Sequence, residues 1–499
     1  MFHINFKINV GKEINKEIEK EILGLINELQ GKFEKLKRNF SYKSKKEKKS
    51  LEINLDSKSY TATDFLVQFE KQVKQIIGKK FKTAIKLEIV DYEIETELET
   101  KAKKQFKIPF VKNLELKDKT ATLIYNKTLS FENIKDHYVE KSLKLIEEKI
   151  KNQSYEGKDE FRETIWEGKQ RKVVYEGDPA VDLEKKDWIR RTEAKGQFIY
   201  GREFTALVNV IKKLQIEHIY KKLSFFEMIF PKFEPWAVPT KSGHAKNVYP
   251  NAYFVCSPKD SSPESWEDVM DEFAITGEVP REKVKEKSEC VGIMSFAQCP
   301  PFWPYLKNKI IDEKTLPLKV YDWSGPTYRN ESGGTHGLDR VEEFNRTETL
   351  WVGTKEQEIK VWEEVKEAFV NFYDKVLDVE IRVAKVTPWW MAHAGLKTET
   401  GTAETGTFDF DAYLPYRGDR DKEWLEIQNV SSNGDKYPQA FNVREKSQDI
   451  LWSGCAGASF QRVVVAFLAQ KGLDSKNWPK NVKEKFNEEI KGLTELKFY

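Results

Sequence analysis

The stretch TYRNESGGTHGLDRVEEFNRTETLW, residues 327–351, decides the fold. Thr327–Glu331 fits a β-strand that leads into the loop after it. The glycine-rich residues 332–337 fit a loop, and the apolar residues from Val341 to Leu350 indicate a returning strand. The sequence therefore predicts an antiparallel hairpin at this point of the chain.

Four side chains of this hairpin suggest a chemistry. Arg329 and Glu331 are two residues apart and so project to the same side of a strand. Arginine suits bidentate binding of phosphate, and glutamate suits a hydrogen bond from an amine. Arg340 and Phe344, across the hairpin, would add a second phosphate contact and an aromatic platform. From composition alone, a surface hairpin with paired charges remains the alternative to a phosphate site.

Length and composition place this hairpin in a larger, well-hydrated protein. The chain has 499 residues, 39% hydrophobic and 33% charged, so two or more domains are expected. It contains no apolar run of membrane-spanning length, and its first residues contain no apolar stretch of signal-peptide length. We therefore expect a cytoplasmic protein without a membrane partner.

The four cysteines do not form a pattern of their own. Cys256, Cys290, Cys299 and Cys455 include no CxxC pair and are too sparse for a disulfide framework. Spacing alone favours four free, partly buried thiols, with metal binding as the less favoured alternative.

The basic charge is concentrated near the N-terminus. Residues 1–160 hold 34 Lys+Arg and 27 Asp+Glu, whereas the rest of the chain holds 50 and 54. Between Lys32 and Lys49 there are nine basic and two acidic residues. Such a cluster attracts the phosphates of a nucleic acid, although a solvated lysine-rich loop is an equal alternative.

The N-terminal third has a mixed α+β pattern. Helical spacing of apolar residues predicts helices over 12–30, 63–77 and 131–150, and strict alternation predicts strands near 51–55 and 85–89. The polar segment 152–180 suggests a domain boundary near residue 160 and a local hairpin over 163–177.

The hairpin at 325–351 resembles motif 2 of the class II aminoacyl-tRNA synthetases. In that family the pattern implies that Arg329 holds the α-phosphate of ATP and the amino-acid carboxylate. It further implies that Glu331 meets the adenine amino group, that Arg340 reaches the γ-phosphate and that Phe344 stacks on the adenine.

Two further segments resemble the same family. Residues 203–235, a helix and strand with Pro231, are similar to motif 1, which implies a homodimer. Residues 453–470 are similar to motif 3, whose arginine, here Arg462, clamps the γ-phosphate. The implied fold is α+β: an antiparallel catalytic sheet flanked by helices over 161–499.

Residues 425–444, LEIQNVSSNGDKYPQAFNVR, resemble the seryl-tRNA synthetases. The resemblance places Glu426 and Asn429 at Mg²⁺ and the ATP phosphates, and Ser431 and Asn433 beside the seryl group. Asn429 is also a candidate contact of serine. The long N-terminal coiled coil of ordinary seryl enzymes is missing, so the chain resembles the zinc-dependent methanogenic type. There the N-terminal domain, here 1–160, is an antiparallel sheet with a helical bundle that binds tRNA(Ser).

That subfamily implies one zinc ion per subunit, held by Cys299, Glu348 and Cys455. Two thiolates and a carboxylate leave one tetrahedral position open, which the α-amino group of serine would fill. Arg346 lies two residues before Glu348 and is expected to orient the substrate; the alternative is a salt bridge to Glu342 or Glu343.

The resemblance also implies a helix-turn-helix insertion, expected at 388–413, with Trp389 and His393 near the substrate. The predicted activity is ATP-dependent formation of seryl-adenylate and transfer of serine to tRNA(Ser). Two rival functions remain: an amino acid:carrier-protein ligase and a catalytically inactive RNA-binding paralogue.

Overall fold

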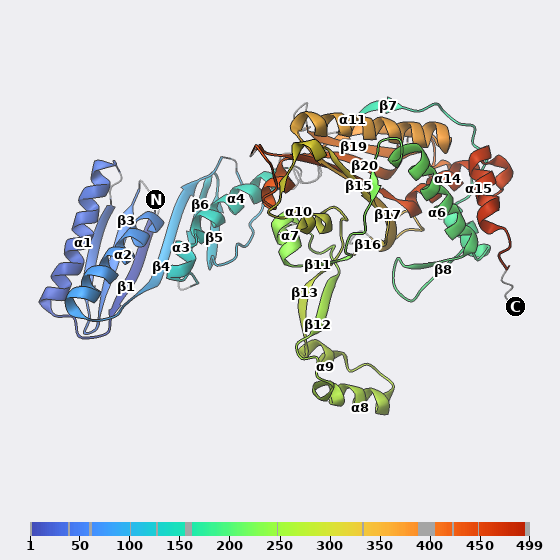
Figure 1. The fold of residues 1–499 in the computed structure, drawn as a ribbon. Coiled ribbons are helices and arrows are strands. Elements are labelled where there is room, and N and C mark those ends of the chain that lie inside the picture. The colour runs from blue at the N-terminus through green and yellow to red at the C-terminus, as the bar shows by residue number, and fades with distance from the viewer. Residues whose placement is uncertain are drawn as a thin grey trace. The chain divides into compact units, whose positions relative to one another are not determined.

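The computed structural model describes residues 2–37, 40–58, 62–99, 101–125, 128–154, 162–246, 248–331, 334–387, 405–421, 424–447 and 449–494. The chain forms two compact units, one made of residues 1–158 and the other of most residues from 159 onward. Figure 1 labels the elements of both units.

The first unit is an antiparallel sheet covered by helices. Its strand order is β2-β3-β1-β4-β6-β5, and every adjacent pair is antiparallel. The strands are β1 (Phe2–Val10), β2 (Phe40–Lys46), β3 (Ser50–Ser57), β4 (Ile85–Glu97), β5 (Asn113–Lys117) and β6 (Thr120–Ile124). The helices are α1 (Lys16–Lys35), α2 (Ala62–Phe81), α3 (Phe131–Lys135) and α4 (Tyr138–Ser154).

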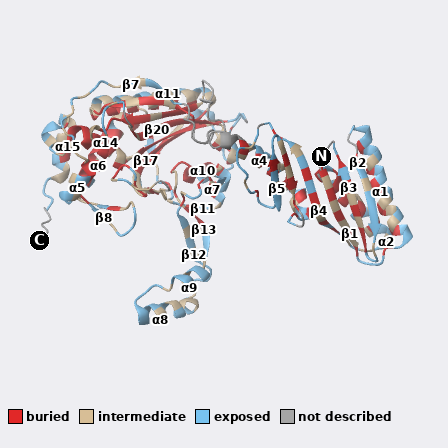
Figure 2. Cartoon of the chain, turned by 180° about the vertical axis from the view of Figure 1, so that it is seen from behind, coloured by how far each residue is buried: buried red, intermediate tan, exposed pale blue. Residues whose placement is uncertain are grey.

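Alternation explains how the first sheet acquires its core. Every second residue of β1 is buried, and these residues form one apolar cluster with the inner faces of α1 and α2. Helix α1 begins at Asn15, whose side chain accepts hydrogen bonds from the backbone N–H groups of Glu17 and Ile18. Figure 2 shows the resulting stripes of buried residues in this unit.

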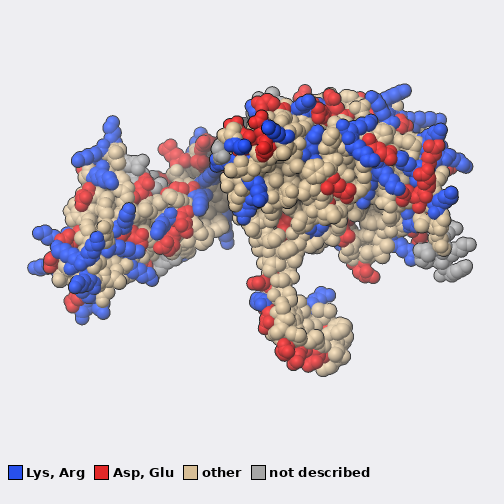
Figure 3. Space-filling model, in the orientation of Figure 1, with Lys and Arg blue, Asp and Glu red and all other residues tan. Residues whose placement is uncertain are grey.

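The basic segment from Lys32 to Lys49 differs from the solvated loop that was considered as an alternative. It contains the end of α1 and the whole of β2, which is an edge strand of the first sheet. The lysines of β2 point mostly to solvent, and charged edge strands resist pairing with other chains. Figure 3 shows basic side chains exposed over this unit.

The second unit is built on a nine-stranded sheet. Its order is β10-β15-β17-β22-β20-β19-β18-β7, with β16 paired to β17. All its pairs are antiparallel except β10 with β15. The strands are β7 (Arg162–Glu167), β10 (Phe226–Glu227), β15 (Leu318–Asp322), β16 (Pro326–Tyr328), β17 (Glu343–Gly353), β18 (Ile381–Val386), β19 (Gly406–Ala412), β20 (Leu425–Gly434) and β22 (Trp452–Ser459).

Helices pack on one face of this sheet, and the side chains of the candidate site lie on the other face. These helices include α5 (Pro179–Lys185), α6 (Arg202–Gln215), α11 (Lys355–Asn371), α14 (Phe460–Lys471) and α15 (Lys480–Ile490). Their apolar sides and the sheet form one large buried cluster. Shorter helices lie elsewhere in the unit: α7 (Ala237–Ser242), α10 (Trp303–Leu306) and α13 (Lys436–Ala440).

Three local expectations are corrected by the observed pairing. The hairpin expected over 163–177 is wrong, because β7 pairs with β18 instead. The strand after α6 is short, since α6 continues into a π-helical turn over Ile216–Tyr220 and β10 has two residues. Gly406–Ala412 form β19, so that end of the expected helix-turn-helix range 388–413 is wrong, and 388–404 lie outside the described residues.

A hairpin of the second unit carries a pair of helices at its tip. Strands β11 (Phe233–Pro235), β12 (Phe254–Pro258) and β13 (Ser288–Met294) form a small antiparallel sheet. Between β12 and β13 the chain forms α8 (Glu267–Thr276) and α9 (Arg281–Glu286), which project from the body of this unit (Figure 1). Within the described part of the chain, no helix is both long and apolar enough to cross a bilayer.

Candidate active site

The functional side chains stand on one face of the large sheet. The register places Ala384, Asp409, Asn429, Gly457 and Glu348 in one row across β18, β19, β20, β22 and β17. Directly opposed residues of antiparallel strands project to the same face, so this row defines the floor of the site.

The motif 2 hairpin forms one wall of the site. Arg329 follows β16, and its backbone N–H donates to Glu342 O at 2.8 Å. Its guanidinium lies over the ring of Phe296, 4.5 Å from the centroid, and 5.9 Å from that of Phe344. Arg340 Nε donates to Glu331 Oε2 at 2.9 Å, so the charge pairing considered as the alternative for this hairpin is present.

Arg346 connects the centre of the floor to its buried end. It belongs to β17 and donates from Nε to Glu348 Oε2 at 2.7 Å. The salt bridge to Glu342 or Glu343 considered as an alternative is therefore wrong. The guanidinium lies directly over Gly457, where an added Cβ would be 1.8 Å from Arg346 Nη2. Glycine at 457 thus leaves room for the arginine side chain.

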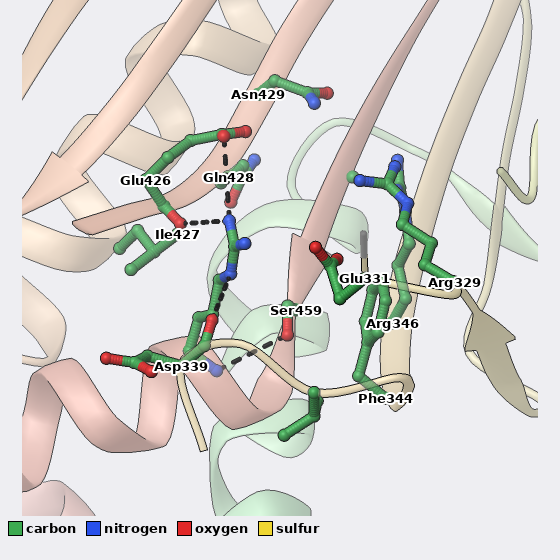
Figure 4. Close-up of a pocket in the computed structure, with 13 residues that line it drawn as sticks. Arg329, Glu331, Asp339, Phe344, Arg346, Glu426, Ile427, Gln428, Asn429 and Ser459 are labelled. Atoms are coloured by element: carbon green, nitrogen blue, oxygen red, sulfur yellow. Dashed lines mark hydrogen bonds and ion pairs between the residues drawn. The ribbon is translucent and has the colours of Figure 1, made fainter. Parts of the chain in front are cut away.

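Arg462 forms the opposite wall from the start of α14. Its Nε donates to Asp339 O at 2.9 Å and its Nη1 donates to Glu426 O at 2.8 Å. The carboxylate of Glu426 lies 3.7 Å from the same Nη1. Figure 4 shows the labelled Asp339 and Glu426 at the two ends of these contacts, with Arg329 and Arg346 across the pocket.

Three guanidinium groups converge at this pocket, which also contains the carboxylates of Glu331, Asp339 and Glu426. Burial, and then the neighbouring Arg346 and Arg462, lower the pKa of Arg329 to about 10. Three guanidinium groups that repel one another in this way form a site for a polyanion. The adjoining cavity has a volume of about 740 Å³. It is lined by Asp178, Arg329, Glu331, His336, Asp339, Arg340, Tyr416, Arg417, Trp424, Leu425, Glu426 and Arg462.

Two sulfurs and a carboxylate meet at the buried end of the floor. One ligand atom each from Cys299, Glu348 and Cys455 lies within 4.8 Å of the other two, and all three residues are buried. Glu348 Oε1 is buried and has no hydrogen-bond partner. A buried carboxylate oxygen without a partner is costly unless a cation compensates it. The donor set therefore fits a tetrahedral zinc site with one open position.

Neighbouring polar groups hold the two thiols. Asn433 Nδ2 lies 3.4 Å from Cys455 Sγ, and the Tyr437 hydroxyl lies 3.9 Å from Cys299 Sγ. The proximity of Cys455, followed by burial, raises the pKa of the Cys299 thiol well above its ordinary value. Zinc binding there would therefore have to displace the proton of the Cys299 thiol.

Ser431 and Asn429 are the remaining expected substrate contacts that the structure describes. Ser431 is buried, and its hydroxyl is 2.9 Å from that of Thr407 on β19. Asn429 lines the pocket on the side of Glu426. Trp389 and His393 lie outside the described residues.

Comparisons with known proteins support one family. The model of the tRNA synthetase class II core domain for G, H, P, S and T matches residues 284–471, and a tRNA-binding domain model matches 1–148. A type-2 serine–tRNA ligase of Methanococcoides burtonii is 40% identical over 447 residues, covering 89% of this chain and 88% of that protein. One from Methanothrix thermoacetophila is 39% identical over the same share of each chain. The chain belongs to the type-2 serine–tRNA ligases.

A solved structure shares the whole fold of this type-2 ligase. It is described as M. kandleri SerRS in complex with A. aeolicus tRNASec. The TM-score is 0.87 at 24% identity, and the match covers 100% of this chain and 98% of that one. This match confirms the predicted α+β architecture, and the core-domain model confirms the class II assignment.

The structure identifies further site residues of this type-2 ligase that the motifs did not indicate. Phe296 stacks on Arg329, and Tyr437, which belongs to the segment 425–444 quoted above, contacts Cys299. Arg417 bonds to Asp339 at the pocket, and Thr407 bonds to Ser431. The last two come from segments in which the sequence shows no local signal.

Cys256 and Cys290 of the type-2 ligase differ from the expected partly buried thiols. Both are exposed, and they lie directly opposite each other on β12 and β13. They therefore belong to neither the core nor the buried sulfur cluster.

Proposed function

We propose that this serine–tRNA ligase activates L-serine with ATP to seryl-adenylate and then transfers the seryl group to the 3′ end of tRNA(Ser). One observation carries the proposal: Arg346 lines the arginine pocket and also bonds to Glu348 of the sulfur cluster. A phosphate site and an amine-binding site that share one arginine suit a reaction between an amino acid and a nucleotide.

The first step is in-line attack of the serine carboxylate on the α-phosphorus of ATP, which releases pyrophosphate. Arg329 would bind the α-phosphate and the attacking carboxylate, and Arg340 and Arg462 would bind the γ-phosphate. These fixed charges neutralise the charge that moves between oxygens during the transfer. The step depends on positioning, and no general base is assigned to it.

The nucleotide and its magnesium occupy the charged half of the pocket in this proposal. Glu331 would accept from the adenine amino group and Phe344 would stack on the adenine, which requires Glu331 to exchange its contact with Arg340. Glu426 and Asn429 would hold Mg²⁺, which neutralises phosphate charge when bound.

Zinc is assigned to Cys299, Glu348 and Cys455, one ion per chain. When bound, it supplies a Lewis-acid position for the uncharged α-amine of the substrate. Arg346 would then orient Glu348 and the substrate carboxylate together. Ser431 and Asn433 would bind the serine hydroxyl, which the position of both beside Cys455 supports. Trp389 and His393 are further candidates.

Transfer to tRNA is assigned to the two units together. We infer that residues 1–160 form the tRNA-binding domain and 161–499 the catalytic domain with motifs 1, 2 and 3. The match of residues 1–148 to a tRNA-binding domain and the exposed lysines of β2 support this. A homodimer through residues 203–235 is part of the same proposal, and Phe226 and Ile229 of that segment are exposed.

Each of the two rival functions disagrees with a feature of this chain. A carrier-protein ligase of this kind has no tRNA-binding domain, whereas residues 1–148 match one. An inactive paralogue would not need three converging arginines or the buried cluster of two thiols and a carboxylate.

Replacing one thiol of the cluster tests the proposal. Cys455→Ala should lose bound zinc and serine-dependent exchange of pyrophosphate into ATP. Cys256→Ser is the matched control, because that thiol is exposed and lies outside the cluster, and it should retain both. Undiminished exchange in Cys455→Ala would exclude the proposed amine site. Offering tRNA(Ser) and carrier protein as competing acceptors separates the leading function from its rival.

A further inference from the structure

An arginine at the edge of the large sheet reaches past its neighbouring strand. Arg162 is the first residue of β7, which pairs with β18. Its guanidinium nevertheless contacts β19: Nη1 lies 3.2 Å from Asp409 Oδ2, and Nη2 donates to Asp411. Ala384 of β18 lies between β7 and Asp409 in the register, so a small side chain occupies the intervening position.

The two carboxylates bound by Arg162 stand next to the nucleotide pocket. Asp409 is directly opposite Asn429. The register between β19 and β20 shifts between Phe410 and Asp411, so Asp411 is directly opposite Glu426. Opposed side chains share a face of the sheet, and both Asn429 and Glu426 line the pocket. The side chain of Asp409 is 17% exposed and that of Asp411 is 3% exposed, so water screens them poorly.

The charges at this end of the pocket are nearly balanced by two arginines. Arg382 Nε lies 3.2 Å from Asp411 Oδ2, while Arg162 contacts both Asp409 and Asp411. Burial, followed by the charge of Glu426, raises the pKa of Asp409 well above its ordinary value, and Arg162 opposes that rise. In its ionised form and without Arg162, Asp409 would add its negative charge to that of Glu426 beside the bound triphosphate. Like charges at short range in a poorly hydrated site repel strongly.

We propose that Arg162 is a positioning residue for magnesium-bound ATP, because it neutralises Asp409 and holds this carboxylate away from the Glu426–Asn429 edge of the pocket. The proposal rests on the assignment of that edge to magnesium and ATP phosphates above. It gives β7, which pairs only at the margin of the sheet, a role in nucleotide affinity.

Arg162→Met tests this role through equilibrium binding. Calorimetry with a non-hydrolysable ATP analogue and Mg²⁺ should show affinity about tenfold weaker than in the unaltered protein. Raising free Mg²⁺ should recover much of the loss, because a cation can replace the guanidinium. The double variant Arg162→Met with Asp409→Asn should also bind more tightly than Arg162→Met alone, since the repelling charge is gone.

Arg171→Met is the matched control for loss of an anchoring arginine. Arg171 bonds through Nε to Asp378 at 3.1 Å and through Nη2 to Asp374 at 2.6 Å, and none of these residues lines the pocket. This variant should lose stability without a magnesium-dependent change in nucleotide affinity. Arg162→Lys keeps one positive charge and should bind the analogue more tightly than Arg162→Met.

Two results would overturn the inference. One is unchanged affinity in Arg162→Met. The other is weakened affinity that neither Mg²⁺ nor Asp409→Asn improves, which would indicate a purely structural role. Failure of the proposed function would look different, because the unaltered protein itself would then show no serine-dependent pyrophosphate exchange.

Discussion

Replacing Gly457 with alanine should inactivate the enzyme through a contact of Arg346. An added Cβ would lie 1.8 Å from Nη2, 2.2 Å from Cζ and 2.4 Å from Nε of Arg346. Non-bonded carbon atoms in contact are about 3.5–4.0 Å apart, so the guanidinium must move by more than about 1 Å. That movement breaks the 2.7 Å bond from Arg346 Nε to Glu348 and leaves a buried carboxylate without its partner.

The magnitude follows from the loss of this buried pair. Removing one partner of a buried ion pair costs about 3–5 kcal/mol, and each 1.4 kcal/mol is a tenfold change in rate. If the loss falls mainly on the bound transition state, serine-dependent pyrophosphate exchange should slow at least about 100-fold.

Two controls separate this effect from general damage to β22. In Gly454→Ala, on the opposite face of the same strand, an added Cβ would lie 2.2 Å from the ring of Trp351 in the core. That variant should lower the melting temperature, with activity surviving in the molecules that remain folded. Arg346→Ala combined with Gly457→Ala should be no slower than Arg346→Ala alone. Exchange in Gly457→Ala close to the parental rate would refute the reasoning.

Three further predictions concern stability, tRNA and the nucleotide. Burial raises the pKa of Glu358 to about 8, so the folded state retains a proton that the unfolded state loses near its usual pKa of 4.5. Stability should therefore fall by about 2 kcal/mol between pH 6 and 8 in urea unfolding, and Glu358→Gln should remove that slope; an unchanged slope would contradict this. Lys43→Glu with Lys45→Glu in exposed β2 should weaken aminoacylation and its salt dependence but spare pyrophosphate exchange, and equal loss of both activities would count against a tRNA role. Arg340→Ala should raise the KM for ATP about tenfold with little change in the KM for serine, which steady-state exchange assays measure.

The motifs were predictable because their chemistry is local in sequence. Arg346 and Glu348 are two positions apart within β17, so strand periodicity alone places this pair on one face. The strand expected over Thr327–Glu331 ends earlier, at Tyr328, so Arg329 and Glu331 follow β16 instead of belonging to it. The alternation at 51–55 likewise predicts the buried side of β3.

The features that sequence did not reveal depend on pairing between distant strands. Arg162 and Asp409 are 247 positions apart, and only the order β7-β18-β19 brings them together. The local hairpin expected after β7 was wrong because turn residues near 168–170 look the same whether the following segment pairs or not. The space that Gly457 leaves for Arg346 depends on the register of β17 with β22, which no local pattern specifies.

The opposed thiols of β12 and β13 provide a natural labelling point at the base of the projecting helices. Directly opposed residues of antiparallel strands have Cβ atoms about 4.5–5.5 Å apart, a span that a dithiol-bridging arsenical dye can join. Cys256 and Cys290 are exposed, whereas Cys299 and Cys455 are buried, so such a dye would discriminate between the pairs by access. A fluorophore could therefore report on the surroundings of α8 and α9 without any cysteine being added to the chain.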